Sequence, residues 1–310
     1  QHLMKRTLRH EKNYDILSGH SHFIPGPGGI LVLTILLLAG ALLGNVVGLI
    51  FLLCLPGAGQ DAMMLISYPL MFLPPMLYAQ SKSLRSSMFE EGIALDSEHF
   101  SKAGFIGCCA LVIAGTLALA FTMDGINSLM PPMPEWLETA LNNMVEGRVW
   151  MNFLCVSIFA PFFEEWLCRG MVLRGLLNYK RKGENGQRGI KPAYAIILSS
   201  LFFGLIHLNP WQALPAFALG CLFGYVYYRT GSLKLTMLMH FTNNTFALIF
   251  SNLDTFKDAE NFLDIMSIPA YIGVAAACIA MLYFIIRAFS RIELQDKTGN
   301  CDKVEEAELI

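Results

Sequence analysis

The sequence predicts an all-α polytopic membrane protein: a bundle of about eight transmembrane helices with a membrane-embedded polar cavity. Its residues are 55% apolar and only 15% charged, which is too apolar for an ordinary soluble domain. Apolar runs long enough to cross a bilayer recur along the whole chain. Charged and polar side chains occur inside the later runs, and such residues usually face a protein or water-filled interior.

The first expected span runs from Ile30 to Leu55, which is too long for the apolar part of a signal peptide. It contains three glycines at four-residue spacing, Gly40, Gly44 and Gly48. Glycines at this spacing let a second helix approach closely, so we interpret them as a packing face. Residues 1–28, which precede the span, are predicted to be a cytoplasmic segment. His20 and His22 in this segment are interpreted as loop residues, because two ligands alone are weak evidence for a metal site.

Seven further spans follow from the apolar runs, and an amphipathic piece is expected over Trp136–Met144. The expected spans are Ala62–Tyr78, Ala103–Met123, Val149–Arg174, Pro192–Leu208, Trp211–Tyr228, Leu233–Ser251 and Ile268–Phe289. The bundle therefore covers residues 29–290, and residues 291–310 form a polar tail. Lys and Arg concentrate in alternate loops, which predicts that both termini are cytoplasmic.

The composition also limits the partners that we expect. The basic residues cluster in loops, mainly Lys180–Lys191, and form no continuous stripe, so we expect a lipid bilayer and no nucleic acid. The eight cysteines include no CxxC pair and lie mostly inside apolar runs. They are interpreted as small buried apolar residues and not as a disulfide framework or a zinc site.

The fourth span contains two adjacent carboxylates and a guanidinium, in the stretch Ala160–Gly170. On a helix, Glu165 and Arg169 lie four residues apart on one face and can form an ion pair. Glu164 points about 100° away and remains available for chemistry. Pro161 lacks a backbone donor, so a kink or a local opening is expected beside Glu164.

Three more polar residues lie in the spans that follow: His207, His240 and Asn244. His240 and Asn244 are four residues apart, so they project from one helical face. A glutamate and a histidine can together hold and deprotonate a water molecule. A second histidine and an asparagine amide can donate hydrogen bonds to a developing oxyanion. These groups together suit the attack of water on an amide carbonyl.

The three motifs resemble those of the CAAX protease and bacteriocin-processing family of intramembrane proteases, called CPBP or Abi. That family has EExxxR, FxxxH and HxxxN motifs on successive spans. Here they correspond to Glu164–Arg169, Phe203–His207 and His240–Asn244, within a catalytic core of about residues 148–252. The resemblance implies that Glu164 is the base and acts with His207 on the attacking water. It also implies that His240 and Asn244 stabilise the tetrahedral intermediate, and that Glu165 and Arg169 support the site.

By the same resemblance, the substrate is a peptide or a membrane protein and the membrane is a bacterial or archaeal plasma membrane. No cofactor is expected for this mechanism. A metal-dependent variant remains open, in which a divalent ion such as zinc binds Glu164, His207 and His240. A transporter with a proton pathway and a non-catalytic immunity protein also remain open, because intramembrane Glu, His and Arg serve such roles as well.

Overall fold

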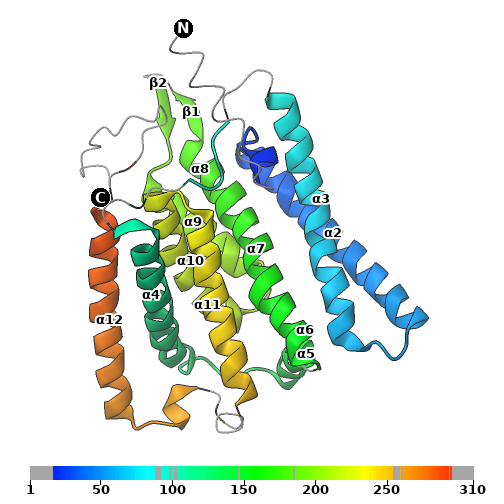
Figure 1. The fold of residues 1–310 in the computed structure, drawn as a ribbon, viewed down its shortest axis with the longest axis vertical. Helices are drawn as coiled ribbons and strands as arrows, with labels where there is room; N and C mark the ends of the chain where they lie inside the picture. Colours follow the sequence, from blue (N-terminus) through cyan, green and yellow to red (C-terminus); the bar gives the residue numbers. More distant parts are fainter. Residues whose placement is uncertain are drawn as a thin grey trace.

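The computed structural model is predominantly helical, and its long helices run side by side along one axis (Figure 1). It describes residues 17–87, 92–97, 100, 103–145, 147–183, 186–253, 259, 261–292 and 294. The long helices are α2 (Pro27–Cys54), α3 (Gly59–Ser86), α4 (Gly104–Asn127), α9 (Pro192–Leu205), α10 (Pro210–Thr230), α11 (Leu233–Asn252) and α12 (Ile268–Ser290). A further continuous helical segment consists of α6 (Val149–Asn152), η4 (Phe153–Phe159), α7 (Ala160–Glu165), η5 (Trp166–Leu173) and α8 (Arg174–Asn178). Each predicted span is therefore helical over most of its length.

The shorter elements complete the chain and add one feature that the sequence analysis did not predict. The amphipathic piece forms α5 (Glu135–Val145), and the one-turn helices are η2 (Ser18–His20) and η7 (Phe262–Asp264). The basic loop after α8 contains an antiparallel hairpin of β1 (Lys180–Gly183) and β2 (Gly186–Gly189), in which Lys180 pairs with Gly189. The all-α prediction therefore holds for the bundle and not for this loop, which extends beyond the helix ends (Figure 1).

Several expectations fall on residues outside the described part. The basic N-terminal residues 1–16 and residues 295–310 of the tail lie outside it. Parts of the polar loop after α3 and of the acidic loop after α11 also lie outside it. The cytoplasmic position of both termini therefore remains a prediction.

Within the described residues, five helical segments are long and apolar enough to cross a membrane. They are Pro27–Cys54, Gly59–Ser86, Gly104–Asn127, Val149–Asn178 and Ile268–Ser290. Helix α9 is apolar but has only 14 residues, and α10 and α11 carry several polar side chains. Large apolar side chains such as Leu42, Leu53 and Phe284 are exposed, as expected for helices that face lipid. The chain is therefore an integral membrane protein, while the number of spans remains a prediction.

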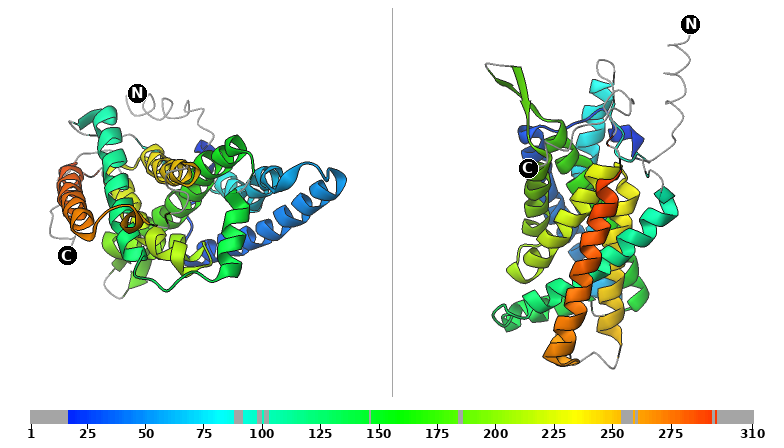
Figure 2. Two further views of the ribbon diagram at one scale, coloured as in Figure 1. Left: turned by 90° about the horizontal axis from the view of Figure 1, so that it is seen from below. Right: turned by 90° about the vertical axis from the view of Figure 1, so that its left-hand side faces the viewer.

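Helices α2 and α3 form a tightly packed pair, and the glycine spacing explains it. A Cβ atom added at Gly40 would lie 2.1 Å from the carbonyl oxygen of Met71, and one at Gly44 would lie 2.5 Å from that of Ser67. Only glycine permits this approach of the two backbones. The predicted packing face is confirmed. Seen from below, the pair extends to one side of the other helices (Figure 2).

The centre of the bundle is η5, because all of its residues from Trp166 to Leu173 are buried. It packs against α9, α10 and α11, which contribute buried side chains such as Ala195, Tyr227 and Leu233. On the outer side, α4 and α12 pack against α10 and α11 in a second apolar cluster. The residues that directly follow the two glutamates are thus fully enclosed by the bundle.

Two buried arginines hold the ends of elements together through backbone carbonyls. Arg174 in α8 donates to the carbonyls of Gly170, Ser21, Ile93, His20 and Phe23, and so ties the chain before α2 to the centre of the bundle. Arg229 in α10 donates to the carbonyls of Phe289, Ser290 and Ile292 at the end of α12. Carbonyls at a helix end lack partners within the helix, so these bonds stabilise both junctions.

Candidate active site

The segment with the two glutamates is wound unusually, since its α-helical turn, α7, lies between two π-helical stretches, η4 and η5. Pro161 lies at the junction of η4 and α7, where it removes one backbone donor from the continuous helical segment. The sequence predicted a local opening beside Glu164, and the π-helical turns are that irregularity. Such turns are rare and occur frequently at functional sites.

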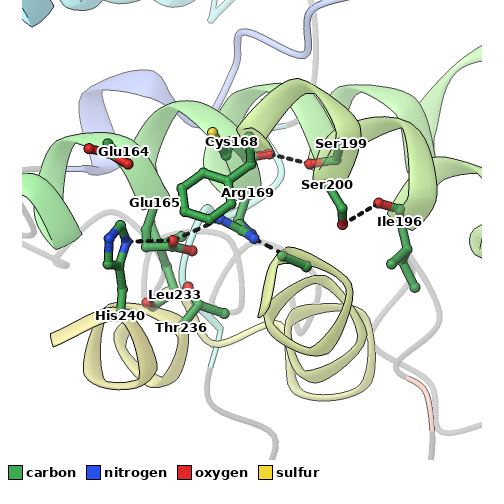
Figure 3. A network of polar contacts seen from close by, with 12 residues as sticks. Glu164, Glu165, Cys168, Arg169, Ile196, Ser199, Ser200, Leu233, Thr236 and His240 are labelled. Carbon is green, nitrogen blue, oxygen red and sulfur yellow. Dashed lines mark hydrogen bonds and ion pairs between the residues drawn. The ribbon is translucent and has the colours of Figure 1, made fainter. Parts of the chain in front are cut away.

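Glu165 is the centre of a fully buried ion-pair network. Its Oε1 accepts a hydrogen bond from Nη1 of Arg169 at 2.7 Å and another from Nδ1 of His240 at 3.0 Å. Arg169 also donates from Nη2 to the carbonyl of Gly220 at 3.1 Å, so the network joins α7, η5, α10 and α11 (Figure 3). The predicted pair of Glu165 and Arg169 is confirmed, and its link to His240 was not predicted. We call Glu165, Arg169 and His240 the closed side of the site.

The ring of Phe203 in α9 contacts all three motifs. The guanidinium of Arg169 lies 4.5 Å from the ring centroid, and the His207 and His240 rings pack edge-on at 5.2 Å and 5.5 Å. A cation over an aromatic face and edge-on aromatic pairs are both favourable. Phe203 is therefore the common contact of the EExxxR, FxxxH and HxxxN motifs.

Glu164 has different surroundings from its neighbour. Its side chain is turned away from Glu165 and His240 (Figure 3), and its Oε1 accepts a hydrogen bond from the hydroxyl of Tyr68 in α3. Its Oε2 is buried and has no hydrogen-bond partner in the part of the chain that the structure describes. One carboxylate oxygen is therefore held by the protein and the other is free to accept a proton.

His207 lies just beyond the end of α9 and not within a helix, which corrects the predicted span Pro192–Leu208. Helix α9 ends at Leu205, and Leu208 adopts a left-handed backbone with φ 58°, which a branched L-residue rarely does. Asn209 holds this turn, because its side chain donates to the carbonyl of His207 at 2.9 Å and caps α10. Backbone strain of this kind is often found at functional sites.

The hydrogen bond of His207 fixes its tautomer. Its Nδ1 lies 2.8 Å from the carbonyl oxygen of Phe203, and a carbonyl only accepts, so Nδ1 carries the proton. Nε2 of the neutral ring is then a proton acceptor. We call the free Oε2 of Glu164 and the Nε2 of His207 the open side of the site. No hydrogen bond joins these two residues among those of the described chain.

Asn244 is fixed by its neighbours on two sides. Its Nδ2 donates to the carbonyl of Val156 in η4 at 2.9 Å, and its Oδ1 accepts from the amide of Asn243 at 3.1 Å. An amide nitrogen carries two protons, so one N–H of Asn244 remains for a ligand. The contact of Asn244 with Val156 was not predicted, because any residue at position 156 would present the same backbone carbonyl.

A cavity of about 320 Å³ lies beside Asn243 and is lined by Asp124 in α4 and by aromatic rings of α11 and η7, including Phe246 and Phe262. None of the four residues predicted for catalysis lines it. A polar cavity around Glu164 therefore remains a prediction. Within the described residues, no group of three or more His, Cys, Asp or Glu side chains is placed to hold a metal ion.

Fold and site together define a class of protein: an integral membrane protein in which glutamate, arginine and histidine from separate helices meet inside the bundle. Residues 146–246 match the family model described as "Type II CAAX prenyl endopeptidase Rce1-like". The "Membrane-embedded CAAX protease MroQ" of Staphylococcus aureus (strain USA300) is 32% identical over 120 residues, which cover 37% of this chain and 47% of that relative. The match thus spans about half the length of the relative. No solved structure matches the chain.

The family model covers the segment that carries the three motifs, and both matches agree with the predicted CPBP family of membrane proteases. The match begins at residue 146, so it excludes α2, α3 and α4. Tyr68, which bonds to Glu164, therefore lies outside the region that the family model covers.

Proposed function

We propose that this protein is an intramembrane endopeptidase that hydrolyses a peptide bond in a peptide or membrane-protein substrate, with Glu164 and His207 activating the attacking water. One observation carries the proposal: the ring of Phe203 packs against Arg169, His207 and His240, so the three motifs meet at one point in the bundle. The membership of the CPBP family supports the same activity.

In the proposed first step, a water molecule lies between two acceptors, Oε2 of Glu164 and Nε2 of His207. One of them takes a proton from the water as its oxygen bonds to the carbonyl carbon, and the carbonyl double bond becomes a C–O⁻ bond. When the intermediate collapses, the C=O bond forms again and the C–N bond breaks. The proton passes to the leaving nitrogen. The oxygen of the water molecule is then part of the new carboxylate, and its proton is on the new amine.

His240 and Asn244 would stabilise the oxyanion, and the geometry sets a condition on His240. Because Nδ1 donates to Glu165, a neutral His240 has an unprotonated Nε2 that cannot donate. His240 therefore acts as an oxyanion donor only as the imidazolium, with Glu165 as its counter-ion. Asn244 has no such condition, since its second N–H is available in every state.

The proposal is tested by comparing protein termini in membranes that contain the wild type, Glu164→Gln or Glu138→Gln. Glu138 lies exposed on α5, so the same chemical change is made there without touching the site. We expect new termini with the wild type and with Glu138→Gln, and none with Glu164→Gln. The purified wild type should then cut the identified substrate in liposomes. An active Glu164→Gln enzyme would refute the proposal.

The metal-dependent variant is separated by a second measurement on the same preparation. Elemental analysis and treatment with a chelator decide between the two forms of the mechanism, because a zinc enzyme loses activity when the ion is removed and regains it when zinc returns. We expect activity to survive the chelator. Loss and recovery of activity with zinc would favour Glu164, His207 and His240 as ligands instead.

A further inference from the structure

We propose that Tyr68 in α3 is a positioning residue for Glu164, an inference that rests on the proposed function. The hydroxyl of Tyr68 donates a hydrogen bond to Oε1 of Glu164. Tyr68 belongs to none of the three motifs and lies outside the matched residues 146–246. The structure thus assigns part of the catalytic arrangement to the helix pair α2–α3, for which the sequence suggested only packing.

The hydrogen bond determines where the reactive oxygen points. A carboxylate is planar, so holding Oε1 at a fixed donor also fixes the direction of Oε2. Oε2 is the atom with no partner in the described chain, although it is buried. Buried polar atoms normally have partners, so an unpartnered carboxylate oxygen at this position is suited to a water molecule or a substrate. Without Tyr68 the carboxylate could rotate about its last bonds and present either oxygen.

The tyrosine ring is itself held in place by aromatic packing between α3 and α7. Its centroid lies 5.6 Å from that of Phe72, and Phe72 stacks on Phe163 with centroids 5.1 Å apart and planes at 15°. Phe163 is the residue before Glu164. The same two helices are therefore joined by a stacked ring pair and by the hydrogen bond, which restricts the position of the hydroxyl.

The glycines of α2 set the rotation of α3. Ser67 and Met71 turn their backbones toward Gly44 and Gly40, where no side chain separates the helices. Tyr68 and Phe72 are the next residues along α3, and on an α-helix they point about 100° away from that contact. This direction is toward α7, as the contacts with Glu164 and Phe163 show. Close packing against α2 on one face of α3 thus places Tyr68 on the adjacent face, which is turned toward α7.

An ion pair between the buried Asp61 and the exposed Arg148 sets the position of α3 along its axis. Asp61 at the start of α3 accepts from Nε of Arg148 at 2.8 Å and from the backbone N–H of Arg148 at 2.9 Å. Arg148 immediately precedes α6, the start of the segment that leads to Glu164. Side chain and backbone both take part, so α3 cannot slide relative to this segment without breaking two hydrogen bonds.

The test separates positioning of Glu164 from a merely structural hydrogen bond. Tyr68→Phe removes one oxygen atom and keeps the ring, and 4-aminophenylalanine at position 68 restores a donor at the same place. We expect Tyr68→Phe to lower kcat by about 10- to 100-fold with KM changed less than about twofold, because a small misplacement of a reacting group has effects of this size. We expect 4-aminophenylalanine to recover most of kcat.

The matched control is Tyr78→Phe, which removes a hydroxyl from the same helix. The Tyr78 ring packs on Phe23, and no hydrogen bond links it to the site among the described residues. Its kcat should equal that of the wild type. A wild-type kcat in Tyr68→Phe, or an equal loss with phenylalanine and 4-aminophenylalanine in a stably folded protein, would overturn the proposal.

A measurement without activity shows which proposal fails if one does. In a double-mutant cycle, Tyr68→Phe and Glu164→Met are combined and detergent unfolding is measured. The two effects should not add, because each substitution removes the same hydrogen bond. If the two substitutions are coupled in stability but the wild-type protein cuts no peptide, the proposed function is contradicted and the hydrogen bond between Tyr68 and Glu164 is still supported. Additive effects would contradict the contact itself.

Discussion

The two adjacent glutamates lie in opposite surroundings. Glu165, on the closed side, is fully buried and accepts hydrogen bonds from Arg169 and His240, so its charge is balanced within the bundle. Glu164, on the open side, accepts from Tyr68 and has one oxygen without a partner in the described chain. Oε2 of Glu165 is also without a partner there, so the two residues differ in the kind of partner that each has and not in the number of free oxygens. The carboxylate paired with a cation and a histidine holds the motifs together, and the one bonded only to a tyrosine hydroxyl is the one that we propose for chemistry.

The largest expected effect comes from breaking the closed side. Arg169→Met removes the cation that balances a buried carboxylate, so the free energy of unfolding should fall by about 3–5 kcal/mol. Activity should be lost with it. Detergent unfolding measures the change, and Arg85→Met, at an exposed position of α3, is the control. Unchanged stability in Arg169→Met would mean that the network does not hold the helices.

On the open side we expect activity to be lost without a loss of stability. His207→Ala should lower kcat by about 100-fold or more, because it removes the proposed proton acceptor. Its stability should stay within about 1 kcal/mol of the wild type, since the ring is half-buried and donates only to the carbonyl of Phe203. Peptide hydrolysis and detergent unfolding test both statements. A fall in stability like that of Arg169→Met would remove the distinction between the two sides.

A smaller effect is expected from a substitution at the contact between α2 and α3. Gly40→Ala would place a Cβ atom 2.1 Å from the carbonyl oxygen of Met71, and a backbone cannot move aside as a flexible side chain can. We expect a loss of about 1–3 kcal/mol in the free energy of unfolding. Gly273→Ala on α12 meets nothing within 4 Å and is the matched control. If both variants unfold alike, the close approach of α2 and α3 contributes no stability.

The smallest expected effect is a pH dependence of the free energy of unfolding, which arises from His20. Burial lowers the pKa of His20 from its ordinary value of 6.5, and the nearby charge of Arg174 acts in the same direction. The folded state therefore binds fewer protons than the unfolded state. The contribution of His20 to the free energy of unfolding is fully present above about pH 6.5 and decreases as the pH falls through the lowered pKa. Detergent unfolding from pH 7.5 to 5 should show this slope, and His20→Phe should reduce it.

The sequence predicted the parts of the site that depend on local spacing. Glu165 and Arg169 pair because they are four residues apart, and the glycines of α2 mark the contact with α3. Contacts between distant segments were not predictable in this way. His240 is 75 residues from Glu165, and Tyr68 is 96 residues from Glu164. No periodicity specifies which faces of separate helices meet.

The end of α9 was missed for a different reason. The turn after it depends on a left-handed backbone at Leu208, and the residues that usually signal such a turn are glycine and asparagine. An apolar residue there made the span look three residues longer than the helix that ends at Leu205. His207 was therefore expected inside a helix, whereas it lies in a turn that Asn209 holds.

The π-helical turns of η4 and the α-helical turn α7 should respond differently to the loss of one residue. A π-helical turn contains one residue more than an α-helical turn, so removing a single residue from η4 restores regular winding and keeps the parts before and after it in the same relative rotation. Removing a residue from α7 instead rotates the part of the chain after it by about 100° and shifts it by about 1.5 Å relative to the part before it. The carboxylate that now meets Tyr68 would turn from it. A single-residue deletion is thus expected to abolish function in α7 and to be better tolerated in η4.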